Sequence, residues 1–430
     1  FTIPNMKVGG PYQVIVSYVG YQNIELNDVQ LRLGEPFRVD FSMVEEGIAL
    51  DELVITASGG ITGQNAGAST QISYERIEGT PTLNRDIDDF LRLTPQASGF
   101  GGGTSFAGTN NRFNAIYIDG AVNNDVFGLA SSGTNGGQTG IAPFSIDIID
   151  QLQVVLSPYD VSLGGFAGGG VNAVTKSGTN KLAGTAYYFL QNEGMAGKLN
   201  GQLADRLGIE DDDRDKLDEF SQKTYGFSLG GPIIKDKVFF FTNVEIQDDI
   251  TPAPFETSTY TGADAGRASV SDLENLKSFL INNYNYDPGT FGNTSDQLEG
   301  FKFFGKLDFN INDKNKLTVR HQYTKAEQFK RNAGSSTRLN FSNNGVFFPS
   351  TTNSSAIELN TNISNKMSNN LIIGYSSVED DRGSLGSDFP YVVIDDVSGG
   401  SIRFGTEEFS TGNFLKQKIF SITNNLKLYK

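Results

Sequence analysis

The feature that most limits the fold of this chain is a two-residue alternation of apolar and polar side chains that recurs through its second half. In KLDFNI, residues 306–311, every second residue is apolar, as in a β-strand with one polar and one apolar face. Lys306 and Asp308 are then expected on the polar face. Eight such segments follow residue 180, and the other seven are residues 182–190, Tyr225–Leu229, Val238–Ile246, Leu317–Val319, Ile357–Leu359, Leu371–Tyr375 and Phe420–Ile422.

The connections between these segments alternate in length. Short turns are encoded by GGPIIKDK, NDKNK and SNKMSNN, whereas long polar stretches cover residues 192–221, 251–299, 327–353 and 382–412. A transmembrane β-barrel has short turns at one end and long loops at the other, and a soluble β-sandwich does not need this difference. No window of about 18 apolar residues is present, so the sequence encodes no membrane-spanning helix. The second half therefore predicts strands of an outer-membrane barrel, with the polar parity facing the lumen.

Charge and composition exclude several classes of function. With 34 Lys and Arg against 50 Asp and Glu, the net charge of −16 lacks the basic surplus that nucleic-acid binding requires. The chain has no Cys, which excludes thiolate metal sites, and its single histidine, His321, argues against a Ser-His-Asp arrangement or a multi-histidine site. We therefore expect no enzyme activity, no catalytic residue, no metal, no cofactor and no nucleic-acid partner.

A glycine-rich run, GGFAGGG at residues 164–170, precedes the strand-like segment VNAVT. A phosphate-binding loop needs the pattern G-x-x-x-x-G-K-[ST] at the start of a helix, and here Lys176 follows a strand pattern instead. The nucleotide interpretation therefore fails.

Residues 1–47 contain three short strand-like stretches, YQVIVSYVG, IELNDVQLRL and FRVDFSMVE, which are too short for a secure core of their own. The stretch GPYQVIVSYVGY, residues 10–21, resembles the last strands of the carboxypeptidase-regulatory-like β-sandwich. This resemblance implies the C-terminal part of that domain, without peptidase activity. Any other small β-sandwich is the alternative.

Residues 48–178 carry a series of different motifs. LDELVIT, residues 50–56, is β-prone and is followed by the linker-like ASGGITGQNAGAS. In TLNRDIDDFLRLTP, apolar residues at helical spacing precede a proline, which predicts a helix over residues 87–93. FNAIYIDGAVNN predicts two strands joined by an Asp-Gly turn, and two more strands flank the glycine run.

The order of these motifs is similar to that in the plug domain of TonB-dependent outer-membrane transporters. The five motifs are LDELVIT, the short helix, YIDG, IDQLQVVLSPYD and GGGVNAVTKSGTN. The chain resembles the Oar-like and SusC-like receptors of Bacteroidetes, and SLGGPIIKDKVFFFTNVE, residues 228–245, extends the resemblance into the barrel. One departure is Leu156-Ser157-Pro158, where the family stretch has Arg-Gly before the proline.

The resemblance implies four regions: a β-sandwich remnant at residues 1–47, a TonB box at 48–58, an α+β plug at 59–178 and barrel strands at 179–430. A barrel of about eight strands has room only for side chains, whereas plugged transporters use about 22. We therefore expect a chain dominated by β-structure that holds the first strands of a plugged barrel of about 22 antiparallel strands. The final NNLKLYK stops inside a strand pattern, in agreement with this expectation. In the resembled plug, the glycine run threads between a four-stranded sheet and the barrel wall.

Two groups of residues are candidate binding sites. The box suits recognition by strand addition, although an ordinary last strand of the N-terminal sandwich is the alternative. Asn110, Asn111 and Arg112 follow a glycine-rich loop and are candidate ligand contacts at the plug apex. The box residues are Leu50, Asp51, Glu52, Leu53, Val54, Ile55 and Thr56.

Two other features have simpler explanations. The acidic stretch IEDDDRDKLDE, residues 209–219, lacks the Gly and Glu that a calcium-binding EF-hand loop needs at its sixth and twelfth positions, so it predicts a solvated loop. His321 shares the parity of Leu317 and Val319, which places it on the lipid face near an aromatic girdle.

The resemblance implies energised import of a ligand across the outer membrane. The ligand would bind the loops and plug apices, and the TonB-ExbB-ExbD complex would engage the box in the periplasm and move the plug. Membrane lipid would surround the barrel, and a surface lipoprotein is a further candidate partner. The alternative is a surface adhesion or structural barrel, or a gated channel component of a secretion complex. Peptide, protein, glycan and siderophore ligands stay open.

Overall fold

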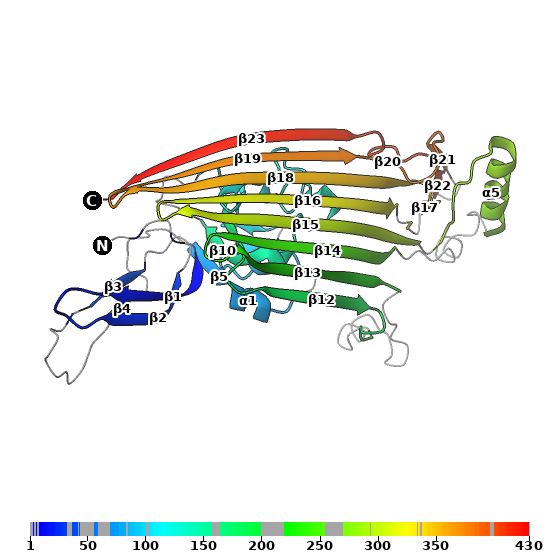
Figure 1. Cartoon of the computed structure of the whole chain (residues 1–430). Helices are drawn as coiled ribbons and strands as arrows, with labels where there is room; N and C mark the ends of the chain where they lie inside the picture. The colour runs from blue at the N-terminus through cyan, green and yellow to red at the C-terminus, as the bar shows by residue number, and fades with distance from the viewer. Residues whose placement is uncertain are drawn as a thin grey trace.

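A long, curved antiparallel sheet forms the largest portion of the molecule, and a second, smaller sheet lies against its inner face (Figure 1). The N-terminal strands lie at one end and a helix, α5, lies at the other (Figure 1). The computed structural model describes residues 3, 6, 8–31, 37–41, 43, 56–58, 69–82, 85–99, 103–156, 164–198, 219–253, 270–292, 294–332, 334–335, 338–395 and 400–429.

The large sheet contains every segment that the alternation predicts. Its strands pair in chain order, each antiparallel to the next, and the short β20 (Gly383–Ser384) pairs with β18. The eight predicted strands are therefore confirmed. They are β12 (Ala183–Asn192), β13 (Ser221–Ile234), β14 (Val238–Ala253), β15 (Thr294–Asn312), β16 (Asn315–Arg331), β18 (Gly345–Ser364), β19 (Met367–Asp381) and β23 (Phe414–Leu428).

The two faces of this sheet have inverted polarity. Phe227 and Leu229 on β13 are 47% and 36% exposed on the face away from the plug. Lys302, Lys306 and Arg320, on the opposite face of β15 and β16, are 4%, 6% and 2% exposed. Apolar side chains outward and charged ones inward are what a membrane barrel requires, because its outer face meets lipid. The predicted lumenal position of Lys306 is confirmed.

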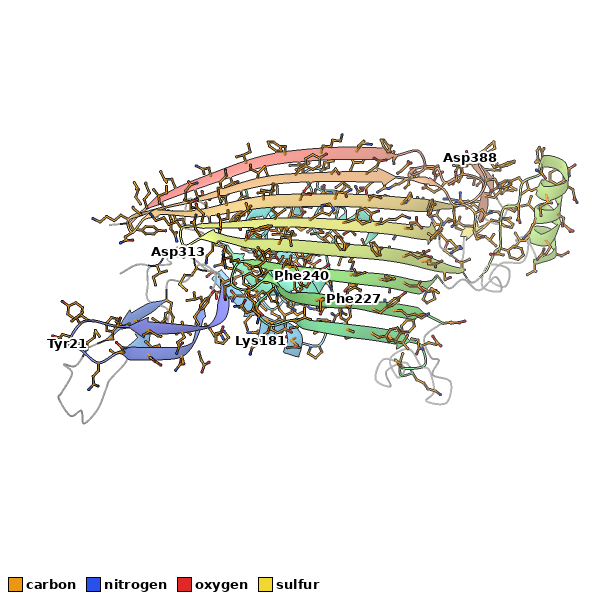
Figure 2. All side chains as sticks on the ribbon, viewed as in Figure 1. Tyr21, Lys181, Phe227, Phe240, Asp313 and Asp388 are labelled. Carbon is orange, nitrogen blue, oxygen red and sulfur yellow. The ribbon has the colours of Figure 1, made fainter. Side chains whose placement is uncertain are left out.

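The two ends of the sheet differ as the sequence predicts. Short turns at residues 235–237, 313–314 and 365–366 lie at one end, called here the short-turn end, and long connections lie at the other. Figure 2 shows Asp313 at the short-turn end and Asp388 at the opposite end. The strands extend farther than predicted, because β14 runs to Ala253 and β18 starts at Gly345.

The long connections are not simply polar loops, and the prediction is incomplete in this respect. The connection after β14 contains α5 (Val270–Tyr284), and later connections supply β17 (Arg338–Asn340), β21 (Val392–Asp395) and β22 (Ser401–Phe404), paired in the order β17-β22-β21. We call α5, these three strands and the connecting residues that pack with them the loop cap. Its apolar core comprises Leu273, Leu280, Tyr286, Leu339, Phe341, Ile402 and Phe404.

The smaller sheet lies within residues 59–178, the region predicted to be the plug, and we call this region the plug. It has five strands in the order β5-β10-β11-β8-β9, and β8 and β11 are parallel. The buried plug core includes Phe241 and Phe304 from β14 and β15, so the plug packs directly on the inner face of the large sheet. The plug strands are β5 (Ser69–Ser73), β10 (Ile149–Val155), β11 (Gly170–Thr175), β8 (Ala115–Ile118) and β9 (Ala121–Val122), with the minor pair β6 (Ala97–Ser98) and β7 (Ser105–Phe106).

The helices of the plug are short. They are α1 (Tyr74–Gly79), α2 (Asp88–Leu91) and the single-turn η1 (Asn111–Phe113), η2 (Gly137–Thr139) and η3 (Ile146–Ile148). The helix predicted over residues 87–93 is therefore reduced to a single turn, because the chain enters successive turns after Leu91. None of the helices in the described residues is long and apolar enough to cross a membrane.

The glycine run serves close packing as predicted, but against different neighbours from the predicted ones. A Cβ at Gly169 would lie 2.4 Å from the Phe106 ring, and one at Gly168 would lie 2.4 Å from Asn114 Oδ1. The close neighbours are thus plug side chains and not the barrel wall, and the sheet that the run joins has five strands rather than four. A positive φ occurs at Gly165 (+82°), where glycine relieves backbone strain.

The N-terminal residues form two small strand pairs. β1 (Gly9–Val16) and β2 (Ile24–Leu31) make a hairpin, and β3 (Arg38–Asp40) pairs with β4 (Thr56–Ser58). The hairpin touches the plug, since Gln151 Nε2 donates a hydrogen bond to the Leu31 carbonyl at 3.3 Å.

Candidate functional site

A cavity of about 470 Å³ opens at one end of the plug. Its walls are the segments that precede β8 and β11 and the segment that follows β9, at the Gly170 end of β11. β11 leads into β12, whose first residue Ala183 pairs with Gly230 near the short-turn end. The cavity therefore faces the long loops. It is lined by Asn111, Arg112, Phe113, Asn114, Asn124, Asp125, Val126, Gly128, Gly133, Gly165, Phe166 and Ala167.

One wall of the cavity is a tight loop built around Asp125. Its carboxylate accepts hydrogen bonds from the backbone N–H groups of Phe127 (3.1 Å), Leu129 (2.6 Å) and Ala130 (2.6 Å). Asx turns of this kind fix a loop, because one side chain satisfies several backbone donors. The loop therefore holds the exposed Val126 side chain at the rim of the cavity.

The asparagines of the lining are committed to the plug itself. Asn111 Nδ2 donates to the Ser131 carbonyl at 2.6 Å, and Asn114 Nδ2 donates to the Thr104 carbonyl at 2.8 Å. These bonds fix the positions of the walls. The amides therefore define the shape of the cavity, and these donors are already used within the plug.

Arg112 is different from these residues. Within the described residues, its guanidinium forms no hydrogen bond or ion pair, while its stem packs so that a Cβ at Gly128 would lie 3.0 Å from Arg112 Cδ. Phe113 beside it is 57% exposed. The cavity therefore offers a cation that no described residue neutralises, next to an apolar rim, and this arrangement can hold an anionic or acceptor group attached to an apolar moiety.

The structure brings together two of the three residues predicted at the plug apex. Asn111 and Arg112 line the cavity. Asn110 does not, because its Oδ1 accepts a hydrogen bond from the Arg112 backbone N–H at 3.0 Å and caps η1. The role of the three residues as ligand contacts stays a prediction.

A buried charge cluster joins the plug to the barrel wall. The Asp119 carboxylate, in the turn between β8 and β9, lies 3.5 Å from Lys306 Nζ and 3.5 Å from Arg320 Nε. It also accepts hydrogen bonds from Thr175 N (2.8 Å) and Thr175 Oγ1 (2.6 Å). Burial alone would raise the pKa of Asp119, but the two cations and the Thr175 bonds outweigh it and hold that pKa below its usual value.

The turn that carries Asp119 is shaped for this contact. Asp119 and Gly120 have φ of 45° and 74°, and both residues of an Asp-Gly hairpin turn need such values. The predicted Asp-Gly turn is therefore confirmed. Arg320 adds a second tie, because one of its terminal nitrogens donates to the Ile118 carbonyl at 2.6 Å.

Further polar contacts surround the plug. Ser145 Oγ donates to Glu245 Oε2 at 2.6 Å, and Lys302 Nζ lies 2.8 Å from Glu245 Oε1, so this carboxylate is shared by plug and barrel. Other plug-to-barrel hydrogen bonds join Gln138 to Asp380, Gln322 and Thr324 to the Pro143 carbonyl, and Gln417 to Asn135.

The sequence does not pair these residues. The signal for one side is present, since Glu245, Lys302 and Arg320 all fall on the polar parity of strands that are otherwise apolar on alternate positions. The signal for the other side is absent, because nothing in the sequence states which plug turn faces which strand.

The predicted TonB box falls mostly outside the described residues. Of Leu50–Thr56, the structure describes only Thr56, which begins β4 and pairs with Asp40 of β3. Thr56 is thus paired with the N-terminal region. This pairing agrees, for this one residue, with the alternative that the box is the last strand of the N-terminal sandwich. Binding of TonB to the box stays a prediction.

Of the acidic stretch and His321, the structure describes His321 in full. His321 has the lipid-facing parity, and its Nδ1 lies 2.8 Å from Ser355 Oγ on β18. Residues 209–218 of the acidic stretch lie outside the described residues. Among the residues that are described, no group of three or more His, Asp or Glu side chains is arranged to hold a metal ion.

Comparison with known proteins gives two family matches. The family described as TonB-dependent Receptor Plug Domain matches residues 63–171, and the family described as Outer membrane beta barrel domain matches residues 174–297. The TonB-dependent transporter Oar of Myxococcus xanthus is 28% identical over 228 residues, which cover 50% of this chain and 20% of that protein.

Solved structures share the fold. The outer membrane transporter YddB from Escherichia coli has a TM-score of 0.57 at 15% identity, covering 84% of this chain and 45% of that chain. The siderophore receptor PirA from Acinetobacter baumannii has a TM-score of 0.51 at 17% identity, covering 84% of this chain and 44% of that one. The chain thus spans less than half the length of these relatives.

These matches confirm the fold class and the location. A plug domain and an outer-membrane β-barrel place the protein in the outer membrane, and the barrel is partial in this chain. The families and relatives are receptors and transporters, which are not enzymes, in agreement with the expectation from composition.

Proposed function

We propose that this chain, which carries the plug domain of a TonB-dependent receptor followed by a portion of an outer-membrane β-barrel, imports a ligand across the outer membrane with energy supplied by TonB. Short turns face the periplasm in such barrels and long loops face the exterior. The plug cavity therefore opens toward the outside of the cell.

The cavity at the outer end of the plug is the observation that carries the proposal. It is about 470 Å³, within the size range of small-molecule sites, and it holds the Arg112 guanidinium, which has no polar partner among the described residues, next to the exposed Phe113 and Val126. A ligand bound here touches the plug directly, so its arrival can be sensed by the element that has to move.

The plug–barrel interface is compatible with movement. Its contacts include the buried Asp119, Lys306 and Arg320 and the shared Glu245. These polar contacts can be replaced by water when the plug shifts, while the apolar packing of Phe241 and Phe304 in the plug core would have to separate at a larger cost.

The remaining elements of the proposal rest on the sequence. The TonB-ExbB-ExbD complex would pair with the box at residues 50–56 by strand addition. The N-terminal strands would be the end of a carboxypeptidase-regulatory-like domain of an Oar-like or SusC-like receptor, with a surface lipoprotein as a further candidate partner. The ligand class is open among siderophores, peptides, proteins and glycans.

The test compares accumulation and surface binding in cells. A panel of isotope-labelled siderophores, peptides and oligosaccharides identifies a probe that wild-type cells accumulate and that cells lacking TonB do not. Arg112→Gln should lower surface binding of this probe and its uptake together, because it removes the cation from the cavity.

A second variant separates transport from binding. Val54→Pro removes a backbone donor from the box, so it should abolish uptake while surface binding stays at the wild-type level, and Val54→Ala should be milder. Normal uptake by Val54→Pro would show that the box is a structural strand. If no probe accumulates in a TonB-dependent way and loss of the protein changes cell adhesion or secretion instead, the alternative function is correct.

A further inference from the structure

The small sheet of the loop cap has two faces of opposite character. β17 and β22 are parallel, with Leu339 opposite Ile402 and Asn340 opposite Arg403. Leu339 and Ile402 are 0% and 7% exposed and face the apolar core of the cap. Because side chains alternate along a strand, Arg338, Asn340 and Arg403 share the other face.

This polar face borders a cavity of about 120 Å³. The cavity lies between the connection that follows β16 and the one that follows β19, and Arg338, Asn340, Tyr391 and Arg403 belong to its lining. It is separate from the plug cavity, with which it shares no lining residue.

The floor of the cavity is fixed by a chain of asparagine amides. Asn332 Nδ2 donates to Asn344 Oδ1 at 3.1 Å, and Asn344 Nδ2 donates to the Gly405 carbonyl at 3.1 Å. Asn340 Nδ2 donates to the Asn332 carbonyl at 3.2 Å. The site is therefore built in advance, which lowers the entropic cost of binding a ligand.

Two buried donors of the cavity lining, Arg403 Nε and the Tyr391 hydroxyl, lack a hydrogen-bond acceptor among the described residues. A buried donor without a partner costs free energy, and a ligand acceptor would remove that cost. Burial and the neighbouring Glu408 carboxylate raise the pKa of Tyr391, so its hydroxyl keeps its proton and can donate.

The two acids of the lining, Glu407 and Glu408, balance the charges of Arg338 and Arg403, so the preference for a carboxylate rests on the geometry of the donors and not on net charge. Glu407 accepts hydrogen bonds from the backbone N–H groups of Ser410 (2.6 Å) and Thr411 (3.3 Å), so its carboxylate is committed within the cap. Glu408 is exposed, as is the neighbouring Phe409 at 78%, and both belong to the outer rim.

We propose that this cavity binds the carboxylate of a small acid or of a peptide chain end at the outer surface. The planar guanidinium of Arg403 presents two parallel N–H donors, a geometry that matches a carboxylate. A cavity of about 120 Å³ has room for a carboxylate and a few attached heavy atoms, and not for a large ligand. The site lies on the loop cap, and its occupancy does not require transport.

Binding of defined probes to the full-length receptor in detergent micelles tests the proposal. The probes are N-acetylalanine and its amide, and an acetylated tri-alanine peptide with a free or an amidated C-terminus, followed by ligand-observed NMR. The free acids should bind and the amides should not. Binding of N-acetylalanine points to small acids, and binding of the peptide acid alone points to chain ends.

Three variants make the result specific. Arg403→Gln should weaken acid binding by about tenfold or more, the effect of losing a charge-assisted hydrogen bond. Arg403→Lys keeps the charge but loses the two parallel N–H donors, so its acid binding should lie between those of wild type and Arg403→Gln. Lys416→Gln removes an exposed cation outside the cavity, on β23, and should bind like wild type.

Limited proteolysis of the cap in each variant checks that it is folded. Equal binding of acids and amides, or equal effects of Arg403→Gln and Lys416→Gln, would overturn the proposal, as would the absence of saturable acid binding to the wild-type receptor.

Discussion

The Asp119→Asn substitution tests whether the buried charge cluster holds the plug in the barrel. Asparagine has nearly the same shape as aspartate and can still accept a hydrogen bond from the Thr175 backbone N–H. It removes the negative charge that lies 3.5 Å from each of Lys306 Nζ and Arg320 Nε. The change therefore leaves two buried cations without their counter-charge.

The structure sets the expected size of the effect. The side chains of Asp119, Lys306 and Arg320 are 8%, 6% and 2% exposed, so water screens the charges little. Removing one partner of a buried ion pair costs about 3–5 kcal/mol. The Thr175 bonds soften the loss, so we expect the plug to be less stably seated by about 3 kcal/mol, which corresponds to about a hundredfold change in an opening equilibrium.

Hydrogen exchange followed by mass spectrometry on the full-length receptor measures this quantity. Peptides that cover β8 and β11 should exchange about a hundredfold faster in Asp119→Asn than in wild type. The pKa of Asp119 is lowered, so its contribution is present above the unfolded value of about 4 and is lost only as pH falls through the lower folded value. The difference between variant and wild type should therefore be constant from about pH 5 to about pH 8.

Two comparisons decide whether the reasoning holds. Glu379→Gln breaks the exposed Lys416–Glu379 pair on β19 and β23, whose side chains are 52% and 50% exposed, and it should change exchange by less than about 0.5 kcal/mol. Lys306→Gln should cost less in the Asp119→Asn background than alone, because the two residues interact. If β8 and β11 exchange at the same rate in Asp119→Asn as in wild type, the cluster does not hold the plug in place.

The plug also allows a pH prediction and a steric one. Burial and the nearby Asp86 and Asp89 carboxylates raise the pKa of Asp88 to about 6, although a hydrogen bond from Thr104 opposes them. The folded plug therefore binds a proton at Asp88 more tightly than the unfolded chain does. Exchange protection of the wild-type plug should therefore fall as pH rises from about 4 through about 6, and Asp88→Asn should flatten that fall; an unchanged slope would contradict it. Gly169→Ala would bring a Cβ to 2.4 Å from the buried Phe106 ring and should destabilise the plug by about 1–3 kcal/mol in the same measurement. Gly164→Ala, with open space around it, should be neutral, and equal effects of the two would show that the contact with Phe106 is not the cause.

The strands of the barrel were predictable because lipid imposes a strict rule. Every second residue of a membrane strand must be apolar, and segments such as Leu307–Ile311 obey that rule without help from distant residues. The Asp119-Gly120 turn was predictable for a similar reason, since its two positive φ angles favour this residue pair locally.

The loop cap was not predicted because its core is not local. Leu273 and Leu280 lie seven residues apart on α5 and give a helical signal, but the polar residues around them indicate a loop. Their partners Leu339 and Ile402 come from other connections, far along the chain. Short strands such as β17 gain stability only when all three connections meet, so no single segment shows the pattern.

The candidate site shows the same division. Arg112 could be placed near the plug apex because a cation after a glycine-rich loop is visible in the sequence, and its contact with a ligand stays a prediction. The place of Asp119 between Lys306 and Arg320 was not, because it depends on how the plug is rotated within the barrel. Side-chain parity gives the face of a strand but not the partner that the face meets.

The place of β5 at the edge of the plug sheet sets how the plug gives way under mechanical load. Among the strands that the structure describes, β5 pairs with β10 alone, and its first residue, Ser69, pairs with Val155 at the end of the sheet away from the short turns. Under the proposed pull by TonB from the periplasm, tension on the chain before β5 would act first on Ser69 and pull it back along the strand. The five residue pairs then separate in succession, as in a zipper, instead of failing together in shear. The force needed at any moment is then the force that separates one residue pair, so β5 can detach from the edge of the plug sheet while β10 and β11 stay in place.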